Sequence, residues 1–146
     1  MSVPAGPPAY YRRMSARTDR HQQWLIDLTS IPTVAGHEGR VVEWLETWAA
    51  RRKDVRMTRD KAGNVVLKSV VRTRKTPVVL TAHIDHPGFV VTSVDRSRRV
   101  GVEFRGGVHG PYFDDARVDL YDAEDQVHRG TITEFDHKTS TGSVRL

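Results

Sequence analysis

Cysteine is absent from this sequence of 146 residues. Disulfides, thiolate metal sites and cysteine nucleophiles are therefore excluded together. No apolar run approaches the roughly 20 residues that a membrane-spanning helix needs. The Pro-rich start, residues 1–11, also lacks the apolar stretch of a secretory signal. We therefore expect a protein of the cytoplasm that does not interact with membranes.

Aromatic residues are also scarce, at 8% of the chain, although the net charge of +5 is basic. A nucleic-acid-binding protein concentrates Lys and Arg on one face, with aromatic residues between them. The arginines of this chain are instead scattered over several predicted elements, which favours an ordinary solvated surface. We therefore expect no nucleic-acid partner. A basic β domain that binds nucleic acid stays open as an alternative hypothesis, and it predicts binding that weakens steeply with salt.

Two helices are predicted in the first third of the chain. Proline and glycine favour a flexible tail over residues 1–18, and Asp19 can cap a first helix that ends before Pro32. A second helix is predicted to begin near Glu38. Its apolar residues fall on one face at helical spacing, and they are Val41, Val42, Leu45, Trp48 and Ala49.

Strands are predicted from Val55 onward, with a turn at residues 60–64. Residues 77–82 are apolar on both faces, which predicts a buried strand in a sheet covered on two sides. Shorter strands are expected at 89–94, 99–104, 117–121 and 131–135 and from residue 143 onward. This order predicts an α/β layer followed by a small β domain that begins near His86.

His83 and Asp85 stand where the predicted buried strand ends. Ligands bind at the carboxyl ends of strands in α/β sheets, and residues two apart on an extended chain share a face. A neutral imidazole is a good zinc ligand, and a nearby carboxylate can accept its other N–H. His83 is thus a candidate metal ligand, although the pair could simply cap the strand. His86 precedes Pro87 and should point away from that face, which favours a turn or a supporting role.

The remaining histidines give no recognisable ligand spacing, and we expect them on the solvated surface. They are His21, His37, His109, His128 and His137. No serine stands in a G-x-S-x-G turn, so the sequence does not support a serine hydrolase.

Three stretches, taken in order, resemble the M42 family of metalloaminopeptidases, which includes glutamyl and tetrahedral aminopeptidases. Residues 28–38, LTSIPTVAGHE, are similar to the family's L-x-x-x-P-x-x-S-G-x-E, and residues 60–65, DKAGNV, to its D-x-x-G-N. The most specific stretch is 81–91, TAHIDHPGFVV, which is similar to A-H-M-D-E-I-G-F-x-V. The related M20 peptidases also use His-x-Asp, but Gly88-Phe89 favours M42.

The resemblance implies an α/β fold. Residues 19–85 would be the N-terminal part of a zinc-peptidase catalytic domain, and residues 86–146 the start of an inserted small β domain. His83 would bind one metal of a dinuclear zinc or cobalt centre. Asp85 would orient this histidine and support catalysis. The substrates would be peptides, and the complete protein would be a homo-oligomer.

Two departures from the family pattern concern His86, which replaces a glutamate, and Ala35, which replaces a serine. In the family, the bridging aspartate, the general base and the other ligands lie after the inserted domain, and no motif here matches them. A catalytic zinc needs about three protein ligands. We therefore expect the N-terminal portion of an aminopeptidase that is inactive alone. The alternative is a non-catalytic assembly or peptide-binding module, whose edge strands could pair with a partner strand.

Overall fold

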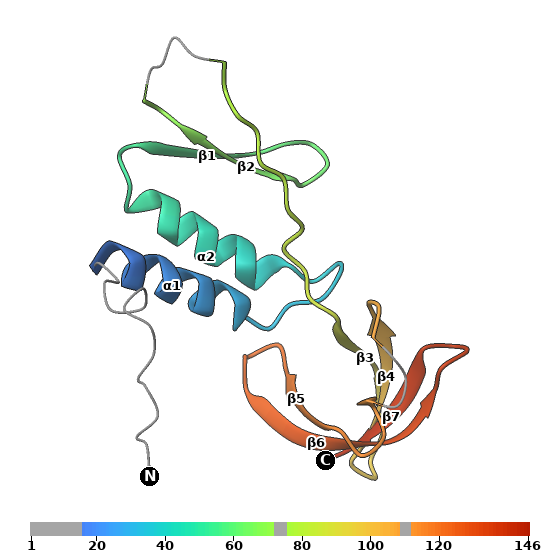
Figure 1. Ribbon diagram of the computed structural model, residues 1–146. Helices are drawn as coiled ribbons and strands as arrows, with labels where there is room; N and C mark the ends of the chain where they lie inside the picture. The colour runs from blue at the N-terminus through green and yellow to red at the C-terminus, as the bar shows by residue number, and fades with distance from the viewer. Residues whose placement is uncertain (1–15, 72–75, 109–111) are drawn as a thin grey trace, which may run out of the picture. The chain divides into compact units, whose positions relative to one another are not determined.

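The computed structural model describes residues 16–71, 76–108 and 112–146. The chain divides into two compact units, residues 1–32 and residues 33–146. The first unit contains helix α1, Ala16–Thr29, which begins three residues earlier than the predicted start at Asp19. The rest of the predicted tail, residues 1–15, lies outside the described residues. The second unit contains every other element (Figure 1).

Helix α2, Gly39–Ala50, confirms the second predicted helix. Four of the five residues on its predicted apolar face are buried, namely Val41, Val42, Leu45 and Ala49. The guanidinium of Arg52 donates a hydrogen bond of 2.7 Å to the carbonyl oxygen of Trp48. This contact satisfies one of the last carbonyls of the helix and places a cation at the negative end of its dipole.

Strands β1, Val55–Arg59, and β2, Val65–Ser69, form an antiparallel hairpin. The predicted turn at residues 60–64 joins them, so that prediction is confirmed. The carboxylate of Asp60 accepts hydrogen bonds from the backbone N–H groups of Ala62 and Asn64, each 2.9 Å long. An aspartate that bonds the backbone ahead of it in this way favours a turn over a continuing strand.

Four turns in the β structure begin with an aspartate whose carboxylate accepts a hydrogen bond from the backbone N–H two residues ahead. These aspartates are Asp60, Asp95, Asp122 and Asp136. The pKa of each carboxyl is lowered, for Asp60 chiefly by the Asn64 side chain and for Asp122 chiefly by the His128 side chain. A lowered pKa means that the ionised carboxylate stabilises the folded state. This contribution is present above the ordinary pKa of 3.8 and is lost as the pH falls through the lower folded values.

The prediction of a buried strand at residues 77–82 is wrong. This segment belongs to no strand, and its large apolar side chains are exposed: Val78 by 85%, Val79 by 78% and Leu80 by 91%. An extended segment is held in a sheet by hydrogen bonds to a neighbouring strand. Within the described part of the chain, no strand pairs with this segment. Its apolar pattern therefore lacks the partners that would bury it.

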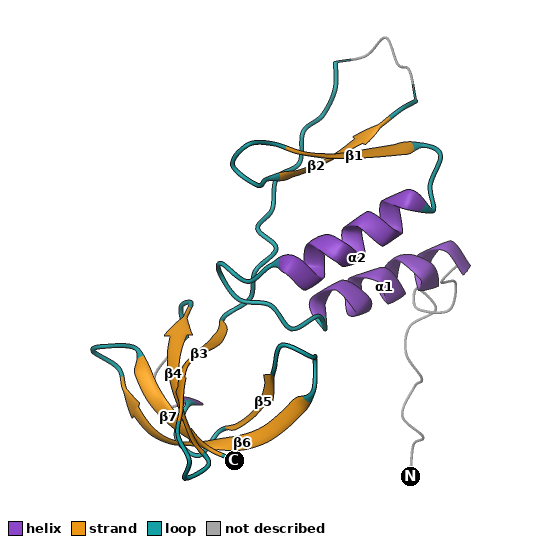
Figure 2. Cartoon of the chain, turned by 180° about the vertical axis from the view of Figure 1, so that it is seen from behind, coloured by secondary structure: helices purple, strands orange, loops and turns teal. Residues whose placement is uncertain are grey.

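The largest structure is a five-stranded antiparallel sheet with the order β3-β4-β7-β6-β5. Its strands are β3, Gly88–Val94; β4, Arg99–Arg105; β5, Arg117–Tyr121; β6, Val127–Asp136; and β7, Thr141–Arg145. The sheet is strongly curved (Figure 2). All five strands predicted after residue 88 are therefore confirmed. The strand predicted at 131–135 is longer, because β6 pairs with both β5 and β7 and each pairing extends it.

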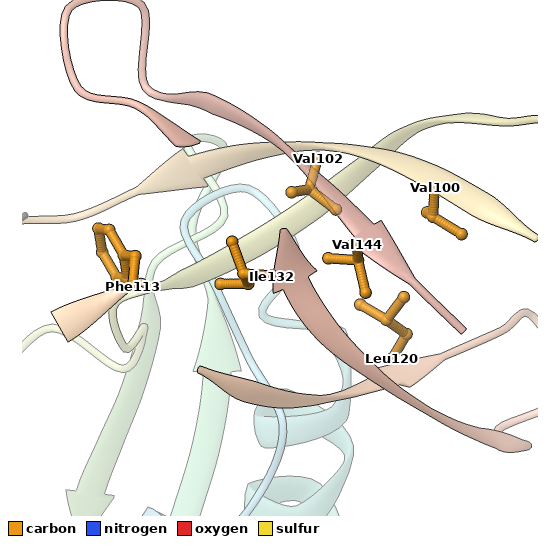
Figure 3. Close-up of a cluster of buried hydrophobic side chains, with 6 residues drawn as sticks. All are labelled: Val100, Val102, Phe113, Leu120, Ile132 and Val144. Atoms are coloured by element: carbon orange, nitrogen blue, oxygen red, sulfur yellow. The ribbon is translucent and has the colours of Figure 1, made fainter. Parts of the chain in front are cut away.

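One face of this sheet carries the core (Figure 3). Its buried residues are Val100, Val102, Phe113, Leu120, Ile132 and Val144. All but Phe113 lie on strands, where they alternate with residues that are less buried, as the strand period of two requires. Phe89, Phe104 and Phe135 pack against this cluster, so all four phenylalanines of the chain meet there.

The described fold is thus mostly antiparallel β structure with two helices, which is compatible with part of a larger catalytic domain. No parallel sheet is present among the described residues. The α/β catalytic domain over 19–85, and the identity of residues 86–146 as an inserted domain, stay predictions.

Candidate functional site

His83 and Asp85 lie in the segment that leads into β3, and their side chains are in direct contact. The Nδ1 atom of His83 is 3.1 Å from a carboxylate oxygen of Asp85 and 3.0 Å from its backbone carbonyl oxygen. A backbone carbonyl oxygen can only accept a hydrogen bond, and the same holds for the carboxylate oxygen of an ionised Asp85. The Nδ1 atom of His83 must therefore carry the proton that is donated to them. The lone pair of the neutral ring is then on Nε2.

The imidazole of His83 is exposed, whereas the carboxylate of Asp85 is largely covered. Their side-chain exposures are 83% and 33%. Within the described residues, Nε2 of His83 takes part in no hydrogen bond. The contact therefore holds the ring on one side and presents an unshared nitrogen on the other. This is the geometry of a histidine metal ligand with a supporting carboxylate.

The described residues supply one candidate metal ligand at this place, the Nε2 atom of His83. No three His, Asp or Glu side chains gather at one place anywhere in the described residues. His86 is half-buried and makes no hydrogen bond or ion pair with another described residue, and its turn or supporting role stays a prediction.

Three of the remaining described histidines have contacts of their own. His128 is hydrogen-bonded to Asp122 at 2.8 Å, His21 contacts the Trp24 ring, and His137 packs on Phe135. These side chains are exposed, as predicted, and so is His37. The predicted surface position of His109 lies outside the described residues.

The loop before α2 is anchored to the start of the five-stranded sheet. Val34 is buried, and a Cβ atom built on Gly88 would lie 3.4 Å from the Val34 Cβ. The guanidinium of Arg105 donates a hydrogen bond of 2.8 Å to the carbonyl oxygen of Ala35. The loop before α2 thus meets residues of β3 and β4 that lie far along the chain, and the contact between Ala35 and Arg105 spans 70 positions. Nothing in the sequence singled out Arg105 for this contact.

Gly106 packs against Pro87, which follows the His83–Asp85 segment in the chain. Its φ is +136°, a conformation that favours glycine, and a Cβ built on it would lie 2.8 Å from the Cα of Pro87. The backbone at Gly106 therefore packs directly on the proline that follows His86. Nothing in the local sequence indicates the contact that requires this glycine.

Replacing Gly106 with alanine is expected to destabilise the fold by about 1–3 kcal/mol, since a strained φ and a clash with Pro87 backbone act together. Denaturant unfolding followed by circular dichroism measures this change. Gly107→Ala is the matched control, because a Cβ at Gly107 meets nothing within 4 Å and its φ is not in the glycine region. Equal stabilities of the two variants would contradict the contact between Gly106 and Pro87.

Among the helices of the described residues, none is both long enough and apolar enough to cross a lipid bilayer.

Comparison with known families gives one match. Residues 63–143 fit the sequence model of a family described as M42 glutamyl aminopeptidase. This range covers more than half of the 146 residues and includes His83, Asp85 and nearly all of the five-stranded sheet. A search of curated proteins finds no match to the chain.

Proposed function

Because this chain belongs to the M42 glutamyl aminopeptidase family, we propose that it is the N-terminal portion of a dinuclear metal-dependent aminopeptidase. The reaction would release N-terminal residues from peptides. The observation that supports this function best is the contact between His83 and Asp85, which leaves Nε2 of the imidazole as the available ligand atom. The family match covers both residues.

Each residue of the pair has one task in this proposal. His83 binds one of two divalent metal ions, zinc or cobalt, through Nε2. Asp85 accepts the Nδ1 proton, keeps the ring in one tautomer and raises its basicity. The metal ions, when bound, supply a water acidic enough to act as a nucleophile near neutral pH. The largely covered carboxylate also limits rotation of the exposed ring.

We further propose that the isolated chain is inactive, and that the complete enzyme is a cytoplasmic homo-oligomer. A catalytic zinc needs about three protein ligands, whereas the described residues bring together one imidazole and the carboxylate that orients it. The other ligands and the general base would come from polypeptide outside these residues.

The test compares two preparations of the protein. One is the 146-residue chain expressed alone, and the other is the assembly isolated through a tag on this chain from its native source. Both are assayed for release of p-nitroaniline from aminoacyl anilides, with added zinc or cobalt. We expect turnover only in the native assembly. Turnover by the isolated chain would contradict the proposed inactivity, and absence of turnover in both would contradict the enzyme.

One observation favours a second function, that of a non-catalytic assembly or peptide-binding module. Residues 77–80 form an extended, exposed apolar segment with no strand partner in the described residues. Such a segment can pair with a strand from another polypeptide. Asp85→Asn separates the two functions, because it would leave strand pairing intact while weakening a metal-dependent enzyme.

A further inference from the structure

A row of basic side chains crosses the outer face of the five-stranded sheet, opposite the core. Arg145 of β7 pairs with Arg99 of β4 on one side and with Thr131 of β6 on the other. Thr131 in turn pairs with Arg117 of β5. Directly paired residues of neighbouring strands point to the same face of a sheet, so these four side chains form one row.

The row contains a like-charge pair. Two arginines directly opposite one another on adjacent strands repel, which lowers the stability of the sheet. Arg99 has a counter-charge, since its guanidinium lies 3.6 Å from the carboxylate of Glu134. Arg145 and Arg117 form no ion pair with any described residue. Their charges are therefore not neutralised by the part of the chain that the structure describes.

A hollow of 560 Å³ lies on this part of the sheet, and its lining includes Arg117, Arg129, Arg145 and Thr131. The side-chain carboxylate of Asp119 also lines it and is 3.7 Å from Arg129. Leu146 lines the hollow as well, and in the 146-residue chain it carries the α-carboxylate. Three guanidinium groups therefore share the hollow with two carboxylates, and the lining keeps an excess of positive charge.

We propose that this hollow binds a phosphate group. Arg117 and Arg145 flank Thr131 from the two neighbouring strands, so their backbones are about 10 Å apart. Two long side chains leaning over β6 can close this gap above the Thr131 hydroxyl. An anion held there neutralises both arginines and removes the repulsion between Arg145 and Arg99.

Phosphate fits this donor set better than a carboxylate does. A guanidinium presents paired N–H donors that suit two oxygens at once. Three such groups and a hydroxyl offer more donors than the two oxygens of one carboxylate can accept. A phosphate has up to four oxygens and a charge near −2. The hollow is larger than a single phosphate, which leaves room for a second phosphate or an organic group.

The test is calorimetric titration of the full 146-residue chain with pyrophosphate at about 0.15 M ionic strength. We expect saturable binding, and a loss of affinity of about tenfold or more in Arg117→Gln/Arg145→Gln, because two charge-assisted hydrogen-bonding groups are removed. The matched control is Arg56→Gln/Arg59→Gln in β1, which removes the same charge elsewhere and should preserve the affinity. Arg117→Lys/Arg145→Lys should bind more weakly than wild type, since lysine keeps the charge but loses the forked donors.

Three results would overturn the proposal. Absence of saturable pyrophosphate binding would show that the hollow is not a phosphate-binding site. An equal loss in the β1 control assigns the binding to net charge alone. Citrate that binds as tightly as pyrophosphate, with the same sensitivity to Arg117 and Arg145, assigns the hollow to carboxylates. A parallel titration with glycerol phosphate distinguishes a free polyphosphate from a phosphate carried on an organic group. The far-ultraviolet circular dichroism of each variant establishes that the sheet is folded.

Discussion

Replacing His83 with alanine is expected to abolish aminopeptidase turnover in the assembly that holds the complete active site. The proposed metal ion would lose a protein ligand, and a site that needs about three of them cannot hold the ion in position with one missing. The side chain is 83% exposed and bonds only to Asp85 among the described residues, so its removal should leave the fold intact. Turnover, bound metal and thermal unfolding of the purified variant assembly measure the three effects.

The variant Asp85→Asn makes the first prediction specific. Asparagine keeps the shape of the side chain but loses the charge that raises the basicity of the ring. Substituting a residue that supports a metal-binding histidine costs about 10–100-fold in metal affinity or activity. We therefore expect a smaller loss than in His83→Ala, partly restored by excess metal. His21→Ala, an exposed histidine of α1, is the control that should retain full activity. Full activity in His83→Ala would overturn the proposed ligand.

The five-stranded sheet could be predicted from the sequence because its patterns are local. Val118 and Leu120 alternate with exposed residues, and the turns begin with aspartates that bond the backbone a few residues ahead. The segment at 77–82 has an equally strong apolar pattern, yet Leu80 is 91% exposed. A pattern indicates that a segment can be buried, but burial also needs a neighbouring strand, and no local signal records whether one is available.

The candidate site also combines a local contact that could be predicted from the sequence with long-range contacts that could not. The contact between His83 and Asp85 follows from a spacing of two residues, and the sequence alone predicted it. The contacts that position the segment join residues far apart in the chain. Arg105 reaches the carbonyl of Ala35 across 70 positions, and Gly106 packs on Pro87. Contacts of this kind depend on how β3 and β4 pair, which periodicity does not specify.

Val144→Asp is expected to destabilise the five-stranded sheet by about 3–5 kcal/mol, a large share of the total stability of an ordinary domain. Val144 lies on the central strand β7 and is 0% exposed. Its direct neighbours on the two adjacent strands are Val100 and Ile132, which are also buried and apolar. A carboxylate at this position would have neither water nor a cation beside it, so it must either remain protonated or open the core.

Two companion variants keep this second prediction falsifiable if Val144→Asp fails to fold. Val144→Ala removes two methyl groups without adding charge and should cost about 2 kcal/mol. Arg145→Asp places the same carboxylate on the same strand at an exposed position opposite Arg99 and should cost little. Denaturant unfolding followed by circular dichroism measures all three. A wild-type unfolding midpoint for Val144→Asp would mean that position 144 is accessible to water, and the assignment of Val144 to the core of the sheet would then be wrong.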